Sequence, residues 1–132
     1  MNERTNKPNI NVTAAMIWKD GRLLITKRPE GSHLAGLWEF PGGKQKANEI
    51  LKECLEREIK EELGMDIRAD EFLLTVQHEY DTKLVNLHLF QCSYLKGFPE
   101  ALEGQEIKWV TPEDLQKYAF PPPDREIIER LF

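Results

Sequence analysis

Three glutamates near the end of one predicted helix are the strongest candidates for chemistry in this chain. Residues 47–63 are mostly strong helix formers and include no proline or glycine. At 3.6 residues per turn, Glu58, Glu61 and Glu62 share one face of that helix. Carboxylates crowded in this way repel one another and raise their own pKa values unless a cation lies among them. The pattern therefore predicts a cation site.

The same helix face is apolar one heptad earlier, where it carries Leu51, Cys54 and Leu55. A stripe that begins as core thus continues as carboxylates, which sets the three glutamates apart from an acidic surface in solvent. The other charged residues of the helix do fit a solvated surface. Two of their pairs have the favourable i,i+4 spacing: Glu53 with Arg57 and Glu56 with Lys60.

The donor types indicate which cation to expect. Carboxylate oxygens without a neighbouring cluster of cysteine or histidine favour Mg²⁺ or Mn²⁺. These ions usually keep some of their waters and bind substrate phosphates together with one or two carboxylates. A metal-assisted reaction of a phosphate compound is therefore the expected use of the helix end.

The spacing around the glutamates matches a known motif. It reads Gly43, five residues, Glu49, seven residues, and then Arg57-Glu58-Ile59-Lys60-Glu61-Glu62-Leu63-Gly64-Met65. This resembles the Nudix box, Gly-x5-Glu-x7-Arg-Glu-U-x-Glu-Glu-x-Gly-U with U a bulky aliphatic residue, and every specified position is met. The resemblance implies the Nudix α/β/α sandwich, an α/β (α+β) fold with a mixed β-sheet between helices.

Motifs outside the box extend the resemblance over nearly the whole chain. They are Thr26-Lys27-Arg28, His33-Leu34-Ala35, the Leu-Trp-Glu-Phe-Pro-Gly-Gly-Lys stretch at 37–44, Glu103-Gly104-Gln105 before Trp109, and Phe120-Pro121-Pro122. They are similar to the MutT-like branch, enzymes that sanitise the nucleotide pool and so serve DNA repair. Enzymes acting on CTP and modified cytosine nucleotides, and the recognition domain of adenine glycosylases, share a similar Leu-Trp-Glu-Phe stretch. A complete glycosylase is excluded by length.

The resemblance also implies roles at the metal end of a site. The expected metal ligands are the backbone carbonyl of Gly42 and the carboxylates of Glu58, Glu61, Glu62 and Glu103. Arg57 would orient the glutamates through charge-assisted contacts, and the alternative is its surface pair with Glu53. Glu58 is the candidate base that activates water, with Glu103 as contender. For Glu103 the alternative is an exposed loop acid.

Base recognition is expected at Arg28, His33, Phe40 and Asp124. The resemblance places Asp124 where MutT-like enzymes specific for 8-oxo-guanine nucleotides have asparagine. An asparagine both donates and accepts hydrogen bonds, whereas an ionised aspartate only accepts, so Asp124 leaves purine and pyrimidine open. The alternatives are an N-cap for Asp124, a loop histidine for His33 and a core ring for Phe40.

The function implied is Mg²⁺-dependent (or Mn²⁺-dependent) hydrolysis of a nucleoside triphosphate to nucleoside monophosphate and pyrophosphate. 8-oxo-dGTP is the leading substrate, and CTP or a 5-substituted (d)CTP is the runner-up. An alternative of another class is a nucleotide-binding Nudix module without turnover. That module usually comes with a degraded box, and here the box glutamates are intact.

The elements that must position these residues follow from the pattern of apolar residues. Strands are expected at 11–18, 22–26, 37–40, 71–80, 84–94 and 107–110, with a hairpin turn at 19–21. Asn48 or an earlier residue would cap the helix 47–63 and Gly64 would end it. A short helix would open at Thr111 and a last amphipathic helix would span 124–132. Without regular βαβ alternation, these elements predict a mixed sheet between helical layers.

Composition sets the remaining expectations. The length of 132 residues predicts one domain at 9–132 after a polar, disordered start at 1–8. A net charge of -5 argues against polymeric nucleic acid as partner but not against nucleotides. No apolar run is long enough for a membrane span, so we expect a cytoplasmic protein, as monomer or homodimer. Cys54 and Cys92 are expected to be buried and reduced.

Overall fold

The computed structural model describes residues 7–32 and 34–132. Most of the predicted start at 1–8, and the candidate His33, lie outside these residues. Four strands precede the first helix: β1 (Asn9–Lys19), β2 (Arg22–Lys27), β3 (Trp38–Glu39) and β4 (Gly42–Lys44). The helix and three strands follow: α1 (Leu51–Leu63), β5 (Asp66–Glu79), β6 (Leu84–Lys96) and β7 (Glu106–Val110). A 3₁₀ helix, Pro112–Lys117, leads to α2 (Pro122–Leu131).

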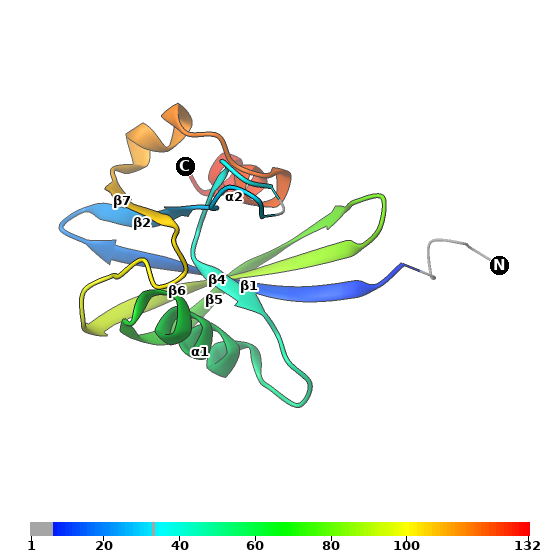
Figure 1. The fold of residues 1–132 in the computed structure, drawn as a ribbon, viewed down its shortest axis with the longest axis horizontal. Coiled ribbons are helices and arrows are strands. Elements are labelled where there is room, and N and C mark those ends of the chain that lie inside the picture. The colour runs from blue at the N-terminus through cyan, green and yellow to red at the C-terminus, as the bar shows by residue number, and fades with distance from the viewer. Residues whose placement is uncertain (1–6, 33) are drawn as a thin grey trace.

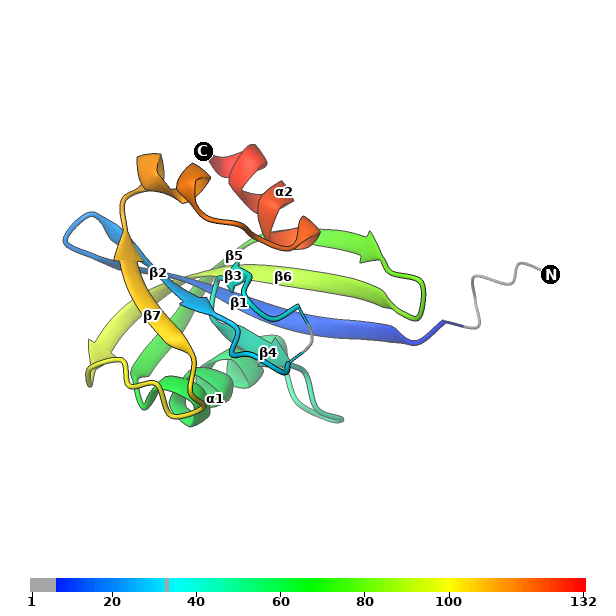
Figure 2. The same ribbon diagram turned by 45° about the horizontal axis from the view of Figure 1, so that its top comes forward.

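Strand β1 is the centre of the sheet. It pairs in parallel with β6 and antiparallel with β2 and β4. Strand β5 extends the sheet antiparallel to β6, while β3 and β7 extend it antiparallel to β2. Helices α1 and α2 lie on opposite faces (Figures 1 and 2). The mixed sheet between helical layers predicted from the sequence is confirmed.

The sheet separates two apolar cores, and β1 contributes to both because its side chains alternate between the faces. Ala14 and Met16 pack on the side of α2, whereas Ala15 and Ile17 pack on the side of α1. The α1 core also contains Leu55, Ile59 and Leu63 from that helix, all fully buried. Of the expected apolar stripe, Cys54 and Leu55 are fully buried, and Leu51 is partly buried against this core. This packing fixes the rotation of α1 about its axis, and therefore the direction of its polar face.

Helix α1 begins at Leu51, so the predicted start at residue 47 is wrong. Asn48 has a positive φ of 63°, which a helix does not accept, and Ile50 occupies the cap position without a side-chain cap. The end is as predicted: Gly64 adopts the left-handed conformation and its N–H bonds to the carbonyl of Lys60. Residues 45–49 form a turn instead, in which Gln45 Nε2 donates to the carbonyl of Glu49 at 2.6 Å.

Strand β4 is absent from the sequence prediction because two of its three residues are glycines, which disfavour strands. The lack of space for a side chain explains both glycines. A Cβ on Gly42 would lie 1.9 Å from the carbonyl oxygen of Thr13, and one on Gly43 would lie 2.3 Å from the carboxylate of Glu58. The close approach of β4 to β1 and α1 therefore requires residues without side chains.

Other expectations hold with small changes. The hairpin turn at 19–21 is confirmed, with positive φ at both Asp20 and Gly21. Strand β5 starts five residues earlier than expected and contains register shifts, which blur the alternation of its side chains. Cys54 and Cys92 are free and buried, as predicted. Among the described residues, no helix is both long enough and apolar enough to span a bilayer.

Candidate active site

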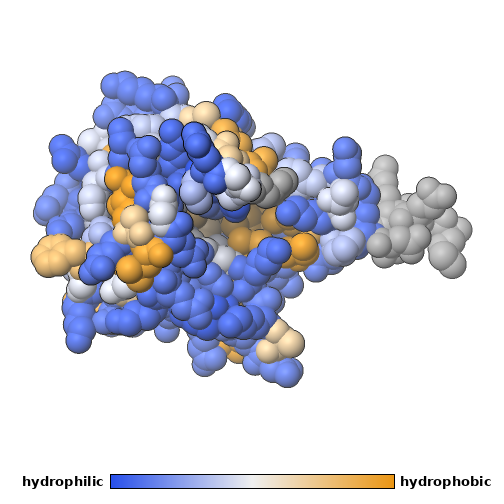
Figure 3. Space-filling view, in the orientation of Figure 1, coloured by the Kyte–Doolittle hydropathy of each residue, from blue (hydrophilic) through white to orange (hydrophobic). Residues whose placement is uncertain are grey.

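One pocket, with a volume of about 560 Å³, collects most of the predicted site residues. This size suits a small-molecule ligand. In the view of Figure 3, hydrophobic residues lie recessed near the middle of a mostly hydrophilic face. The predicted residues among the pocket lining are Arg28, Phe40, Gly42, Glu58, Glu61, Glu62, Glu103 and Asp124. Arg57 is not part of the lining.

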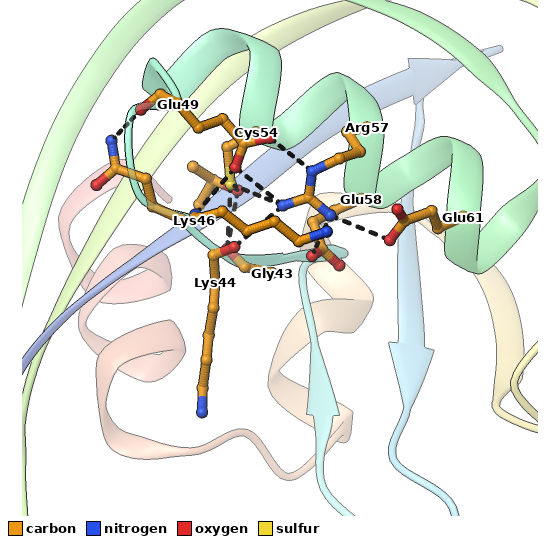
Figure 4. Close-up of polar contacts among 10 residues, drawn as sticks. Gly43, Lys44, Lys46, Glu49, Cys54, Arg57, Glu58 and Glu61 are labelled. Carbon is orange, nitrogen blue, oxygen red and sulfur yellow. Dashed lines mark hydrogen bonds and ion pairs between the residues drawn. The ribbon is translucent and has the colours of Figure 1, made fainter.

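Arg57 is the centre of a hydrogen-bond network behind the glutamates (Figure 4). Its Nε and Nη2 donate to the two carboxylate oxygens of Glu49 at 2.6 and 2.9 Å. Its Nη1 donates to Glu58 Oε1 at 2.9 Å and to Glu61 Oε2 at 3.0 Å. Nη2 also reaches the carbonyl of Lys44 at 3.2 Å. One guanidinium thus fixes two pocket glutamates relative to each other and to β4.

Both predicted surface pairs on α1 are wrong. Within the described part of the chain, Arg57 has no ion pair with Glu53, because Glu49 from the preceding turn takes that place. Lys60 pairs with Asp66 at 3.1 Å, while the carboxylate of Glu56 accepts the N–H of Ala69. Helical spacing alone missed these partners because each lies outside the helix.

Glu49 holds the guanidinium of Arg57 in place, although the sequence analysis assigned Glu49 to the surface. Its side chain is only 14% exposed. The hydrogen bonds from Arg57, and then one from the N–H of Lys46, lower the pKa of Glu49 to about 2. The same contact raises the pKa of Arg57. The fixed spacing of Glu49 within the box was the signal that it had a role.

Glu62 is in a different electrostatic state from Glu49. Burial, followed by the negative charge and hydrogen bonding of Glu58, raises its pKa well above the usual range, and Glu103 and Glu39 add to the effect. Glu61 and Glu62 also lie in the last turn of α1, where the helix dipole is negative and disfavours carboxylates. Without a further cation this end of the pocket carries more negative charge than its surroundings compensate.

The described residues include no group of three or more aspartate, glutamate, histidine or cysteine side chains close enough to hold a metal ion. Arg57 draws Glu58 and Glu61 toward itself, and Glu103 lies exposed on its loop. The donor set nevertheless fits a hard divalent cation, since it consists of oxygens and includes the carboxyl of Glu62, whose raised pKa a cation would relieve. The candidate ligands therefore remain the predicted ones.

Asp124 also lines the pocket and belongs to α2. The helix starts at Pro122 with Pro121 at the cap position, so the capping alternative for Asp124 is wrong. Its Oδ2 accepts the main-chain N–H of Phe40 at 3.1 Å, which ties α2 to the segment between β3 and β4. Burial, and then the negative charge of Glu39, raises the pKa of Asp124 to about 8. This raised pKa favours the neutral form of the carboxyl.

The other two described candidates for base recognition, Phe40 and Arg28, also line the pocket. The ring of Phe40 is 2% exposed and stacks on Phe120 with centroids 5.9 Å apart, as its core alternative expected, although Phe40 also contributes to the pocket. Arg28 Nη2 donates to Glu39 Oε1 at 3.2 Å. Burial raises the pKa of Glu39 despite this partner.

Sequence reasoning missed several lining residues: Glu39, Lys44, Tyr80, Lys83 and Gln105. Glu39, Lys44 and Gln105 belong to quoted motifs but were given no role. Tyr80 and Lys83 flank the turn between β5 and β6, and no local pattern marks them. The fold alone brings that turn to the pocket.

Comparison with known proteins gives matches over nearly the whole chain. The sequence model of the NUDIX domain matches residues 12–130. A CTP pyrophosphohydrolase of Escherichia coli is 37% identical over 120 residues, which cover 91% of this chain and 89% of the relative. An 8-oxo-dGTP diphosphatase of Buchnera aphidicola is 36% identical over 121 residues, covering 92% of each protein. The crystal structure of a MutT protein from Methanosarcina mazei has a TM-score of 0.84 at 32% identity, covering 95% of this chain and 94% of that one.

The pair of Glu49 and Arg57 makes stability depend on pH. Because the pKa of Glu49 falls from 4.5 to about 2 on folding, its ionised form stabilises the fold fully above pH 4.5, and this contribution disappears as the pH falls through about 2. We expect urea unfolding to show Glu49→Gln less stable than the wild type at neutral pH, with the difference shrinking through that acidic range.

The matched control is Glu53→Gln, an exposed position on the same helix. It should stay close to the wild type at every pH. Equal losses in the two variants, or a Glu49→Gln deficit that persists at low pH, would contradict this role of the pair.

Proposed function

This chain belongs to the Nudix hydrolase family as a MutT-like nucleoside triphosphate pyrophosphohydrolase, and we propose that its preferred substrate is 8-oxo-dGTP. The products would be the nucleoside monophosphate and pyrophosphate, and the physiological role would be sanitising of the nucleotide pool. The observation that carries the proposal is that one pocket is lined both by the box carboxylates and by Asp124, a buried carboxyl with a raised pKa.

In the proposed site, Glu58, Glu61, Glu62, Glu103 and the carbonyl of Gly42 would hold Mg²⁺ or Mn²⁺. The ion would supply charge neutralisation for the phosphates and for the departing pyrophosphate. Family members of this branch are expected to direct water at the β-phosphorus. The protein would place the triphosphate between the glutamates and Lys44 of β4. It would also accept the proton of the attacking water.

Glu58 is the proposed proton acceptor. Arg57 holds its Oε1 at 2.9 Å, and Gly43 leaves room for its carboxylate against β4. These contacts fix the position of Glu58 before substrate arrives, which favours catalysis because no reorganisation is needed. Glu103 remains the contender, since it reaches the same pocket from an exposed loop.

The protonation state of Asp124 supports recognition of an oxidised purine. Unmodified guanine offers two acceptors, O6 and N7, along its major-groove edge. In 8-oxo-guanine the N7 position carries a hydrogen and becomes a donor beside the O6 acceptor. A neutral carboxyl donates and accepts at once, so it can pair with the oxidised edge but meets a mismatch on unmodified guanine. Asp124 can then do what asparagine does in the 8-oxo-guanine branch.

CTP or a 5-substituted (d)CTP is the second candidate. A neutral carboxyl also matches cytosine, whose exocyclic amine donates next to a ring nitrogen that accepts. The E. coli relative named as a CTP pyrophosphohydrolase has an identity close to that of the 8-oxo-dGTP diphosphatase from Buchnera. Asp124 therefore supports both substrates, and a direct comparison must separate them.

We expect a panel of 8-oxo-dGTP, dGTP, CTP, dCTP and 5-methyl-dCTP to show the highest kcat/KM for 8-oxo-dGTP when pyrophosphate release is measured with Mg²⁺. Highest efficiency on a cytosine nucleotide would replace the preferred substrate by the second candidate.

Glu62→Gln should lower kcat by about three orders of magnitude with an unchanged fold, because it removes a ligand carboxylate. A kcat close to that of the wild type would contradict the proposed site.

Base selection should depend on pH in a way that Asp124 controls. Because burial raises the pKa of Asp124 to about 8, its donor hydrogen is lost as the pH rises through that value. We expect KM for 8-oxo-dGTP to rise between about pH 7 and pH 9 in the wild type and to change less in Asp124→Asn, whose amide keeps its donor. Parallel profiles for the two proteins would remove Asp124 from base recognition.

A further inference from the structure

The loop between β6 and β7, residues 97–105, is attached to the end of α1 that carries the pocket glutamates. Figures 1 and 2 both show this yellow loop beside the helix end. The N–H of Glu100 donates to the carbonyl of Leu63 at 2.9 Å, and the N–H of Leu102 donates to the carbonyl of Glu62 at 3.2 Å. These carbonyls belong to the last turn of the helix, where acceptors have no partner within the helix. The loop supplies those partners.

Close packing fixes the first part of the loop on the same helix end. Gly97 has a φ of 91°, and a Cβ there would lie 3.0 Å from the carbonyl oxygen of Gly64. A Cβ on Gly64 would lie 3.6 Å from the side chain of Leu102. The backbone contacts and the close approach at Gly97 hold residues 97–102 against α1, but Glu103 follows after them.

Gln105 connects Glu103 itself to the helix. Its Nε2 donates to the main-chain carbonyl of Glu62 at 3.2 Å, and its Oε1 accepts the main-chain N–H of Glu103 at 3.0 Å. One side-chain amide thus bridges the backbones of two residues whose carboxylates both line the pocket. Gln105 is half-buried and also lines the pocket, so this bridge lies next to the carboxylates it would organise.

We infer that Gln105 is a positioning residue, which sets the place of the Glu103 carboxylate by linking the Glu103 main chain to that of Glu62. The inference rests on the proposed function, because it gives Glu103 a role in turnover. Only a side chain that donates and accepts at the same time can make both contacts, and among side chains of this length glutamine does so. Gly104, with a φ of 76°, follows Glu103 directly, so the loop has a flexible residue at the point that the bridge restrains.

The variant that tests the bridge is Gln105→Met, which keeps the length of the side chain and removes both hydrogen bonds. Misplacement of a catalytic group by about 1 Å costs up to about 100-fold in rate, so we expect kcat to fall by about 10- to 100-fold with KM changed by less than about threefold. In a Glu103→Gln background the same change should cost less than about twofold, since the carboxylate it positions is gone. Gln116→Met, at an exposed glutamine of the 3₁₀ helix, is the matched control and should behave as the wild type.

A second readout needs neither metal nor substrate. In the metal-free protein, amide hydrogen exchange at Glu103 should become about tenfold faster in Gln105→Met, while amides in the middle of α1 keep their rates. Gln105→Ala serves as a second variant if methionine impairs folding.

The outcomes separate this inference from the proposed function. Unchanged exchange at Glu103, or equal kcat losses with and without the Glu103 carboxylate, would overturn the positioning role. If no nucleotide is hydrolysed, or if Glu103→Gln is fully active, the proposed function or its use of Glu103 fails instead, and unaltered exchange would then reject the bridge independently.

Discussion

The concentration of negative charge at the C-terminal end of α1 is the constraint on which the rest of this structure depends. A helix ends in partial negative charge and favours cations there, yet this one places Glu61 and Glu62 in its last turn, one turn after Glu58. Arg57 compensates part of the charge through Glu58 and Glu61. Burial, and then the negative charge of Glu58, raises the pKa of Glu62, so its ionised form is disfavoured in the absence of a cation. In the proposed function, a cation bound together with a polyphosphate would relieve this charge.

The elements around α1 can be understood as supports for this arrangement. Strand β4 consists largely of glycine so that its backbone can pass between β1 and the carboxylate of Glu58. The turn before α1 places Glu49 against the far side of Arg57. The loop before β7 satisfies the last carbonyls of α1 and brings Glu103 to the same pocket. Each support acts on the backbone or on a charged group, while the apolar core between α1 and the sheet fixes the orientation of the helix.

Sequence reasoning recovered most of what depends on local periodicity. The helical repeat predicts that the three glutamates share one face, and all three line the pocket, although Glu61 is exposed and does not continue the buried stripe. The alternation of apolar residues predicts most of the strands. Sequence reasoning failed where tertiary contacts determine the local structure or the partner of a charged residue. The start of α1 is delayed by the turn that positions Glu49, β4 is a strand despite its glycines, and Arg57 takes a partner from outside its helix. The raised pKa of Asp124 was likewise hidden, because it follows from burial and from the charge of Glu39, which no spacing along the chain reveals.

The most direct test of the central claim is the number of protons released when Mg²⁺ binds near pH 7, measured by calorimetry in buffers of different ionisation enthalpy. Because metal ligands must be deprotonated and Glu62 has a raised pKa, the wild type should release up to about one proton per ion bound, and Glu62→Gln clearly fewer. Binding without proton release, or equal release by both proteins, would contradict the view that a cation relieves the charge at this helix end.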